Sequence, residues 1–191
     1  MQPHTIFFIG KPGSGKGTQA KLLSEATGWP VKVTSDGLRE IIAADGAVGR
    51  KLKETIDAGR LAPSWFPTYV FLKWLFALPE DGSVIFDGFN RKLQEAELIL
   101  ESLQWVGRPF SVFHLHVPDE EVRGRIALRR DVEGRADDHV VDTRLEEYYT
   151  NTEATIDLFR KAGVLIEIHG VGKPEDIATE VRAALDLPAG K

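Results

Sequence analysis

Short apolar runs recur along the chain and alternate with segments of helical periodicity. The runs that predict strands are Thr5–Gly10, Val31–Thr34, Val84–Phe86, Ser111–Val117 and Val164–His169. The segments that predict helices are Lys16–Thr27, Leu38–Ala44, Val48–Ala58, Trp65–Ala77, Glu95–Leu103, Asp119–Arg130, Asp142–Ala162 and Glu175–Leu185. Strands that alternate with helices favour parallel pairing, because each connection crosses the sheet. The pattern predicts an α/β fold, a doubly wound five-stranded parallel sheet flanked by helices.

One predicted helix is unusually aromatic. It carries Trp65, Phe66, Tyr69, Phe71, Trp74 and Phe76. These side chains could form a platform that stacks on a nucleotide base, but their near-helical spacing favours packing in the core. We therefore assign none of them to chemistry.

Composition narrows the class of protein. The 191 residues fit one domain, with 42% hydrophobic and 28% charged residues. With 24 basic and 29 acidic residues the net charge is −5, which argues against a general nucleic-acid surface. The absence of cysteine excludes disulfides and Cys-ligated zinc. No basic leader precedes the first strand and no apolar run reaches about 18 residues, so we expect a cytoplasmic protein without a membrane segment.

A glycine-rich segment follows the first predicted strand. Residues Gly10–Gln19 read Gly-Lys-Pro-Gly-Ser-Gly-Lys-Gly-Thr-Gln and lead into a predicted helix. Backbone N–H groups of such a turn can surround phosphate oxygens, and Lys16 adds a full positive charge. The spacing matches the P-loop, although Gly17 stands where Ser or Thr usually follows the lysine. The flanking strand and helix favour a nucleoside triphosphate site over a plain structural turn.

Candidate partners for phosphates and metal lie farther along the chain. Asp87 follows the third apolar run, where a carboxylate would lie beside the P-loop and could hold Mg²⁺, directly or through water, with Thr18 as a second candidate ligand. Six arginines fall at strand-to-helix junctions or helix ends, namely Arg39, Arg91, Arg125, Arg129, Arg135 and Arg144. Phosphoryl transfer requires charge neutralisation around three equatorial oxygens, so this set favours transfer over hydrolysis alone.

Several motifs resemble those of one family. The segments concerned are Gly10–Gln19 with its extra glycine, Asp87-Gly88-Phe89-Asn90-Arg91, Arg125–Arg129, Gly134–Asp138 and Arg144–Tyr148. With these motifs the chain resembles the adenylate kinase family of nucleoside monophosphate kinases over essentially its whole length. The resemblance implies a P-loop NTPase-type core with a flap over the nucleoside monophosphate (NMP) and a short lid over the triphosphate.

The resemblance also implies a role for individual residues on the donor side. ATP would be held by Gly13, Ser14, Gly15, Lys16, Gly17, Thr18, Arg125 and Gly172. The transferring phosphoryl group would be surrounded by Lys16, Arg91, Arg129, Arg135 and Arg144. Mg²⁺ is expected to accompany ATP. No zinc is expected, because the lid is short and the chain has no cysteine.

On the acceptor side the resemblance implies a second set of residues. These are Thr34, Asp36, Arg39, Arg60, Leu61, Ala62, Gly88, Arg91 and either Gln94 or Glu95. Ungapped alignment puts Glu95 at the position that reads the acceptor base, and a one-residue deletion puts Gln94 there instead. An amide can both donate to and accept from adenine, whereas a carboxylate only accepts. Thr34 favours AMP, while Ser35 and Asn90 depart from the family pattern.

The expected organisation is a single P-loop kinase domain, residues 1–191. Its core would comprise residues 1–32, 63–128 and 138–191, its NMP-binding flap residues 33–62 and its lid residues 129–137. Closure of the lid would exclude water, which otherwise competes with the acceptor phosphate.

The sequence predicts reversible phosphoryl transfer from MgATP to a nucleoside monophosphate, with AMP as the favoured acceptor (ATP + AMP = 2 ADP). The alternatives are a kinase for UMP, CMP or another nucleoside monophosphate, and a regulatory nucleotide-binding protein without activity. The expected partners are ATP, ADP and AMP or another nucleoside monophosphate, and the expected state is a monomer.

Overall fold

The computed structural model describes residues 3–44, 46–133 and 141–187, with only the helical backbone for 129–133. Its strands are β1 (Thr5–Gly10), β2 (Val31–Val33), β3 (Val84–Asp87), β4 (Phe110–His116) and β5 (Leu165–His169). Its helices are α1 (Lys16–Thr27), α2 (Thr34–Ala43), α3 (Ala47–Asp57), α4 (Trp65–Ala77), α5 (Leu93–Trp105), α6 (Asp119–Glu133), α7 (Val141–Glu147), the π-helical η2 (Tyr148–Thr152), α8 (Glu153–Lys161) and α9 (Pro174–Ala183). Every predicted strand is present, within a residue or so of its predicted bounds.

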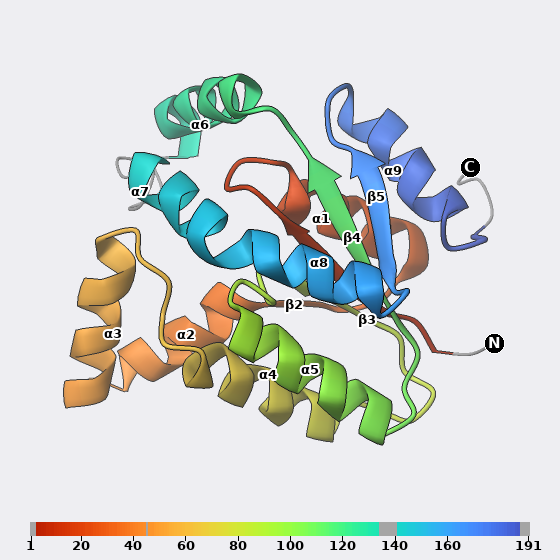
Figure 1. Ribbon diagram of the computed structural model, residues 1–191, viewed down its shortest axis with the longest axis horizontal. Helices are drawn as coiled ribbons and strands as arrows, with labels where there is room; N and C mark the ends of the chain where they lie inside the picture. Colours follow the sequence, from red (N-terminus) through yellow and green to blue (C-terminus); the bar gives the residue numbers. More distant parts are fainter. Residues whose placement is uncertain (1–2, 45, 134–140, 188–191) are drawn as a thin grey trace.

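The five strands form one sheet in the order β2-β3-β1-β4-β5, and every neighbouring pair is parallel. The central strand β1 lies between β3 and β4 (Figure 1). Phe8 pairs with Asp87 in the register of β1 and β3, and Val33 pairs with Asp87 in that of β2 and β3. The carboxyl ends of these three strands therefore meet at one edge of the sheet, which is where parallel α/β sheets bind ligands.

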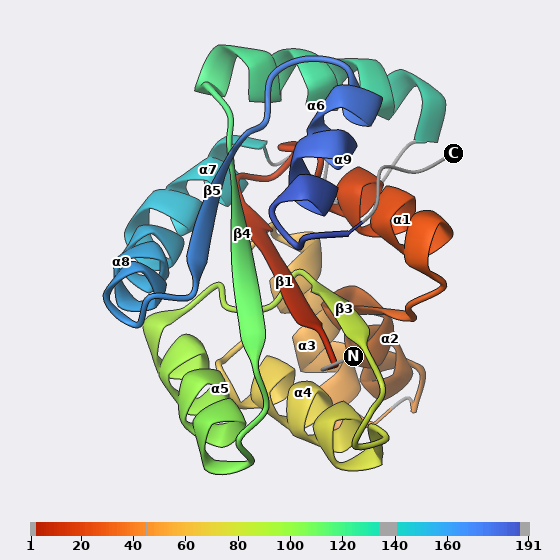
Figure 2. The same cartoon turned by 90° about the vertical axis from the view of Figure 1, so that its right-hand side faces the viewer.

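Two helical layers cover the sheet, and β1 contributes side chains to both. Phe7 and Ile9 pack into a cluster with residues of α4, α5 and α8, whereas Ile6 and Phe8 pack against α1 and α9. Figure 2 shows the same division, with α5 and α8 on one side of the sheet and α1 and α9 on the other. Side chains alternate along a strand, so a strand that is apolar at every position is buried on both faces. The predicted fold class is confirmed.

Helix α2 begins four residues earlier than the sequence pattern predicts. The turn-forming residues Ser35, Asp36 and Gly37 favour a helix from Leu38, but the helix begins at Thr34 and β2 ends at Val33. Thr34, Gly37 and Leu38 form its buried face. Packing of this face against α4 therefore overrides the local turn preference.

The long helix predicted over Asp142–Ala162 is divided by a π-helical turn. The side-chain amide of Asn151 donates to the carbonyl oxygen of Glu147 (3.1 Å), an acceptor that an α-helix reserves for a backbone N–H. The backbone N–H of Glu153 accordingly bonds to the carbonyl of Tyr148, five residues back.

Half of the aromatic residues of α4 contradict the prediction of core packing. Phe66 and Phe71 are buried and Trp74 packs against the core, but Trp65, Tyr69 and Phe76 are 61%, 57% and 77% exposed. Their spacing around the helix is wide enough that no one face buries all six. Within the described ranges, none of the helices is both long and apolar enough to cross a lipid bilayer.

Candidate active site

One large cavity of about 1580 Å³ opens at the carboxyl ends of β1 and β3. From the predicted donor side it is lined by Gly13, Ser14, Gly15, Lys16, Gly17, Thr18, Arg125 and Gly172. From the predicted acceptor side it is lined by Thr34, Asp36, Arg39, Arg60, Leu61, Ala62, Gly88, Arg91 and Glu95, and Asp87 and Arg144 complete the predicted set. The fold thus brings residues from distant parts of the chain to one cavity.

The glycine-rich loop at one end of the cavity is wrapped around the Lys16 ammonium group. Lys16 Nζ donates to the carbonyl oxygens of Gly10 (2.8 Å) and Lys11 (2.6 Å) and lies 3.4 Å from Ser14 Oγ. Gly15 precedes α1 with φ of +97°, a left-handed conformation that glycine adopts without steric cost. The N-terminus of α1 and a lysine thereby come together at this end of the cavity, and such an arrangement can bind phosphate oxygens.

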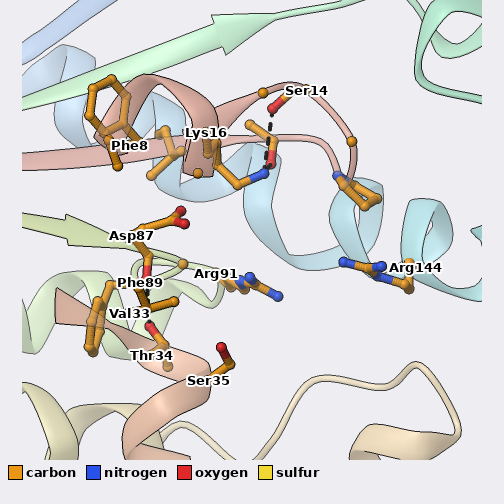
Figure 3. Close-up of a pocket in the computed structure, with 18 of the residues that line it drawn as sticks. Phe8, Ser14, Lys16, Val33, Thr34, Ser35, Asp87, Phe89, Arg91 and Arg144 are labelled. Carbon is orange, nitrogen blue, oxygen red and sulfur yellow. Dashed lines mark hydrogen bonds between the residues drawn. The ribbon is translucent and has the colours of Figure 1, made fainter. Parts of the chain in front are cut away.

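Two arginines face each other across the middle of the cavity. Figure 3 shows the guanidinium groups of Arg91, which follows β3, and Arg144 of α7 pointing toward one another. Beside Arg91, Gly88 has φ of +86°, and a Cβ atom there would lie 3.1 Å from Arg91 Nη2. The Thr34 hydroxyl donates to the carbonyl oxygen of Asp87 (3.2 Å) and fixes the start of α2 to this turn.

Arg125 connects three segments at the donor end. Its Nη2 donates to the carbonyl of Gly170 (2.9 Å), Nη1 lies 3.4 Å from the carbonyl of Ser14, and Nε donates to Glu121 (2.8 Å). It therefore lies between the glycine-rich loop, α6 and the segment after β5, where Gly172 is exposed on the cavity wall. A planar guanidinium in this place can stack on a flat ring.

The acceptor end is more open. Arg39 forms an ion pair with Asp36, and their side chains remain 71% and 59% exposed. Lys92 Nζ lies 3.4 Å from the carbonyl of Leu61 and so connects the start of α5 to the segment from Gly59 to Ala62. An exposed ion pair of this kind contributes little stability, so Arg39 can exchange Asp36 for a phosphate at small cost.

The structure distinguishes the two candidates for reading the acceptor base. Gln94 is exposed on α5 and is not among the residues that line the cavity, whereas Glu95 lines it and is only 2% exposed. Burial raises the pKa of Glu95 to about 7, although backbone N–H groups of Asn90, Arg91 and Lys92 and the charge of Arg91 act against this rise.

The comparisons with known proteins agree with this geometry. The family model described as adenylate kinase matches residues 8–164. The chain belongs to the adenylate kinase family. It is 35% identical to the adenylate kinase of Thermus thermophilus over 185 residues, covering 95% of this chain and 97% of that protein. For the adenylate kinase of Leptospira biflexa the identity is 35% over 179 residues (92% and 96% covered), and for that of Archaeoglobus fulgidus it is 33% over 211 aligned positions (95% and 97%). Membership of the adenylate kinase family makes the protein a phosphotransferase.

Adenylate kinases act on nucleotides with Mg²⁺, and the residues beside the glycine-rich loop fit that ion. Gly17 comes so close to Asp87 that a Cβ atom at residue 17 would lie 3.3 Å from Asp87 Oδ2. Gly17, Thr18 and Asp87 line the same cavity. Carboxylate and hydroxyl oxygens are ligands that suit Mg²⁺, which also retains several waters. The oxygen atoms of Asp87 and Thr18 are therefore compatible with magnesium bound to ATP.

Two predicted arginines cannot be placed at the site. Arg135 lies outside the described residues, and for Arg129 only the helical backbone is described. Their roles remain those that the adenylate kinase resemblance implies.

Sequence analysis gave no role to several residues that line the cavity, Tyr148 and Thr152 among them. Both line it together with Arg144. The Tyr148 hydroxyl lies 3.2 Å from Nε2 of the buried His114, whose Nδ1 lies 2.6 Å from Glu167. If His114 carries its proton on Nδ1, it donates to Glu167 and accepts from Tyr148. Arg144, Tyr148 and Thr152 are spaced by four residues, and this spacing in the sequence was the available signal.

Proposed function

We propose that the protein transfers a phosphoryl group reversibly from MgATP to AMP and so produces two molecules of ADP. One observation carries this proposal. A phosphate-binding loop and a second set of polar residues line opposite ends of the same cavity, and Arg91 and Arg144 face each other between them. A site for hydrolysis alone needs no second nucleotide pocket.

The chemistry that we propose is positioning with charge neutralisation. Lys16 and the loop N–H groups bind the outer phosphates of ATP, and Arg91 with Arg39 binds the acceptor phosphate. Arg144 approaches from α7 and stabilises charge on the transferring group. Asp87 and Thr18 would hold Mg²⁺, which would supply neutralisation of phosphate charge. The acceptor phosphate is already anionic, so the mechanism requires no general base.

AMP is the acceptor that we favour. Thr34 is buried at the base of the acceptor end, with its hydroxyl hydrogen directed to Asp87, so its oxygen remains available as an acceptor. The relatives named above are adenylate kinases that are similar along almost the whole chain. Ser35, Asn90 and Glu95 depart from the family pattern, so UMP, CMP and other monophosphates are the alternatives that an assay must include.

The decisive experiment is a coupled assay of diphosphate formation from ATP with AMP, CMP, UMP, GMP or dAMP. We expect the highest kcat/KM with AMP and a loss of at least a hundredfold in the folded Arg91→Ala variant. A preference for another monophosphate would reassign the acceptor. No turnover with any of the five, together with ATP binding, would identify a regulatory nucleotide-binding protein.

A further inference from the structure

The segment that carries Arg91 has an unfavourable conformation. Asn90 has φ of +62°, in the left-handed region that non-glycine residues seldom occupy. Its side chain is fully buried, and neither polar atom of its amide has a hydrogen-bond partner among the described residues. Both features cost free energy, so the surrounding structure must hold Asn90 and Arg91 in place.

The backbone N–H groups of this segment are held by one buried carboxylate. Glu95 Oε1 accepts from the N–H of Asn90 (2.7 Å), and Oε2 lies 3.4 Å from the N–H of Arg91. Glu95 is the third residue of α5, and its carboxylate also accepts from the backbone N–H of Lys92, the residue that caps the start of the helix.

The carbonyl groups of the same two residues are held from the opposite side. The Thr152 hydroxyl of η2 donates to the carbonyl oxygen of Arg91 (3.0 Å). The Thr155 hydroxyl of α8 lies 3.0 Å from the carbonyl oxygen of Asn90 and 2.7 Å from that of Thr152, so its one hydrogen is shared between them. Thr152 is 4% exposed and Thr155 is fully buried.

We propose that Glu95, Thr152 and Thr155 are positioning residues that fix the backbone of Asn90 and Arg91 and thereby aim the Arg91 guanidinium at the acceptor phosphate. This inference rests on the proposed function, because it assigns the three residues to the binding of that phosphate. They act through Arg91: their polar atoms contact its backbone segment, while its guanidinium points away into the cavity toward Arg144 (Figure 3).

The proposed arrangement involves one continuous helical segment, α7 followed by η2. Arg144, Tyr148 and Thr152 of this segment all line the cavity. Thr152 is the last residue of η2 and contacts Arg91, and Arg144 lies two turns earlier on the same helix. This helical segment thus carries Arg144 into the cavity and also contacts the backbone carbonyl of Arg91 through Thr152.

The test uses Thr152→Val, which retains the shape of the side chain and removes only the hydroxyl. We expect kcat/KM for AMP to fall about tenfold, because a small misplacement of a positioning group is costly, while KM for ATP stays within about twofold of wild type. Thr152→Ser should restore most of the loss. The matched control is Thr179→Val on α9, where an exposed hydroxyl donates to the carbonyl oxygen of Glu175 and accepts from Arg182 of the same helix. It should leave kcat/KM unchanged.

A double-mutant cycle then separates positioning from a general structural effect. In an Arg91→Ala background, Thr152→Val should cause little further loss in kcat/KM for AMP. The proposal is overturned if Thr152→Val behaves like Thr179→Val, or if its effect is equally large without the Arg91 side chain. If Arg91→Ala itself leaves kcat/KM for AMP unchanged, the result contradicts the role of Arg91 in the proposed function. If Arg91→Ala lowers it but Thr152→Val does not, only the positioning proposal is contradicted.

A second variant applies if Thr152→Val does not fold. Thr155→Val removes the hydroxyl that contacts the carbonyl oxygens of Asn90 and Thr152. It enters the same cycle with Arg91→Ala and should lower kcat/KM for AMP by a larger factor than kcat/KM for ATP. A wild-type kcat/KM for AMP in this variant would overturn the proposal.

Discussion

Gly17 stands where any side chain would press against the carboxylate of Asp87, since a Cβ atom there would lie 3.3 Å from Asp87 Oδ2. The residue is the second of α1, where alanine normally stabilises a helix by about 0.5–1 kcal/mol relative to glycine. The glycine is therefore explained by the space that it leaves beside Asp87, the carboxylate that we propose holds Mg²⁺, rather than by backbone conformation.

We expect Gly17→Ala to lower kcat about tenfold or more and to raise the Mg²⁺ concentration needed for half-maximal rate, because crowding displaces Asp87 from its working position. The free energy of unfolding should be unchanged or slightly higher. Steady-state kinetics over a magnesium titration, with urea unfolding, provide the measurement. Gly124→Ala in α6 is the control, because a Cβ atom there meets nothing within 4 Å. Equal magnesium dependence in both variants would contradict this account.

Glu95 should make stability depend on pH. Its pKa is about 7 in the folded protein and near 4.5 when unfolded, so the folded state binds more protons between these values. The stability that this proton uptake contributes is present below pH 4.5 and is lost as the pH rises through 7. The full loss is on the order of 3 kcal/mol.

Glu95→Gln removes this titration. Urea unfolding from pH 5 to pH 8 should show that the wild type loses stability relative to Glu95→Gln as the pH rises. The difference between the two curves cancels the contributions of other titrating groups. Parallel curves would mean that Glu95 is not buried in solution as it is in the structure.

At the scale of the elements, α2 depends on the close approach of α4. A Cβ atom on Gly37 would lie 2.3 Å from Val70 Cγ1, so the two helices approach through the missing side chain. This contact also explains why the helix includes residues that locally favour a turn. Because α2 carries Thr34, Asp36 and Arg39, its packing decides where the acceptor end of the cavity lies.

Gly37→Ala should destabilise the protein by about 1–3 kcal/mol, because it overpacks this contact. Val70→Ala should also destabilise it, by removing buried methyl groups. The double variant should lose less free energy of unfolding than the two single variants lose together, since the new methyl occupies part of the vacated volume. Chemical denaturation measures all three, with Gly124→Ala as the helical control. Strict additivity would show that the two side chains do not compete for space.

At the scale of the whole molecule, the cavity requires the sheet, the glycine-rich loop, α2, α5 and the helix of α7 and η2 to assemble together. The residues at its two ends come from distant parts of the chain, so a ligand that spans both ends should stabilise the fold as a unit.

Two adenosines linked by five phosphates provide such a ligand. At about 100 times its dissociation constant it should stabilise the folded state by about 2.7 kcal/mol, and it should bind more tightly than ATP or AMP alone because it occupies both ends. Thermal unfolding over a ligand titration measures this. Arg91→Ala should weaken the spanning ligand and leave ATP binding close to wild type. Binding of the spanning ligand no tighter than that of ATP would contradict a two-nucleotide cavity.

The sequence determined most of the architecture, for a local reason. Runs such as Thr5–Gly10 are apolar at successive positions and can be buried only as strands covered on both faces. The glycine-rich loop and Asp87 were found because a phosphate site needs particular residues at particular spacings after particular strands. Each of these features depends only on residues that are nearby in the sequence, in the same helix or strand or in the next one.

The tertiary structure decided what depends on contacts between distant segments. The start of α2 at Thr34 follows from its packing on Val70, and the choice between Gln94 and Glu95 follows from which one faces the cavity. Thr152 acquires its contact with Arg91 only after η2 packs beside the segment that joins β3 to α5. Periodicity along a chain reports which faces are apolar. Which distant group meets each polar side chain is fixed only when the whole fold forms.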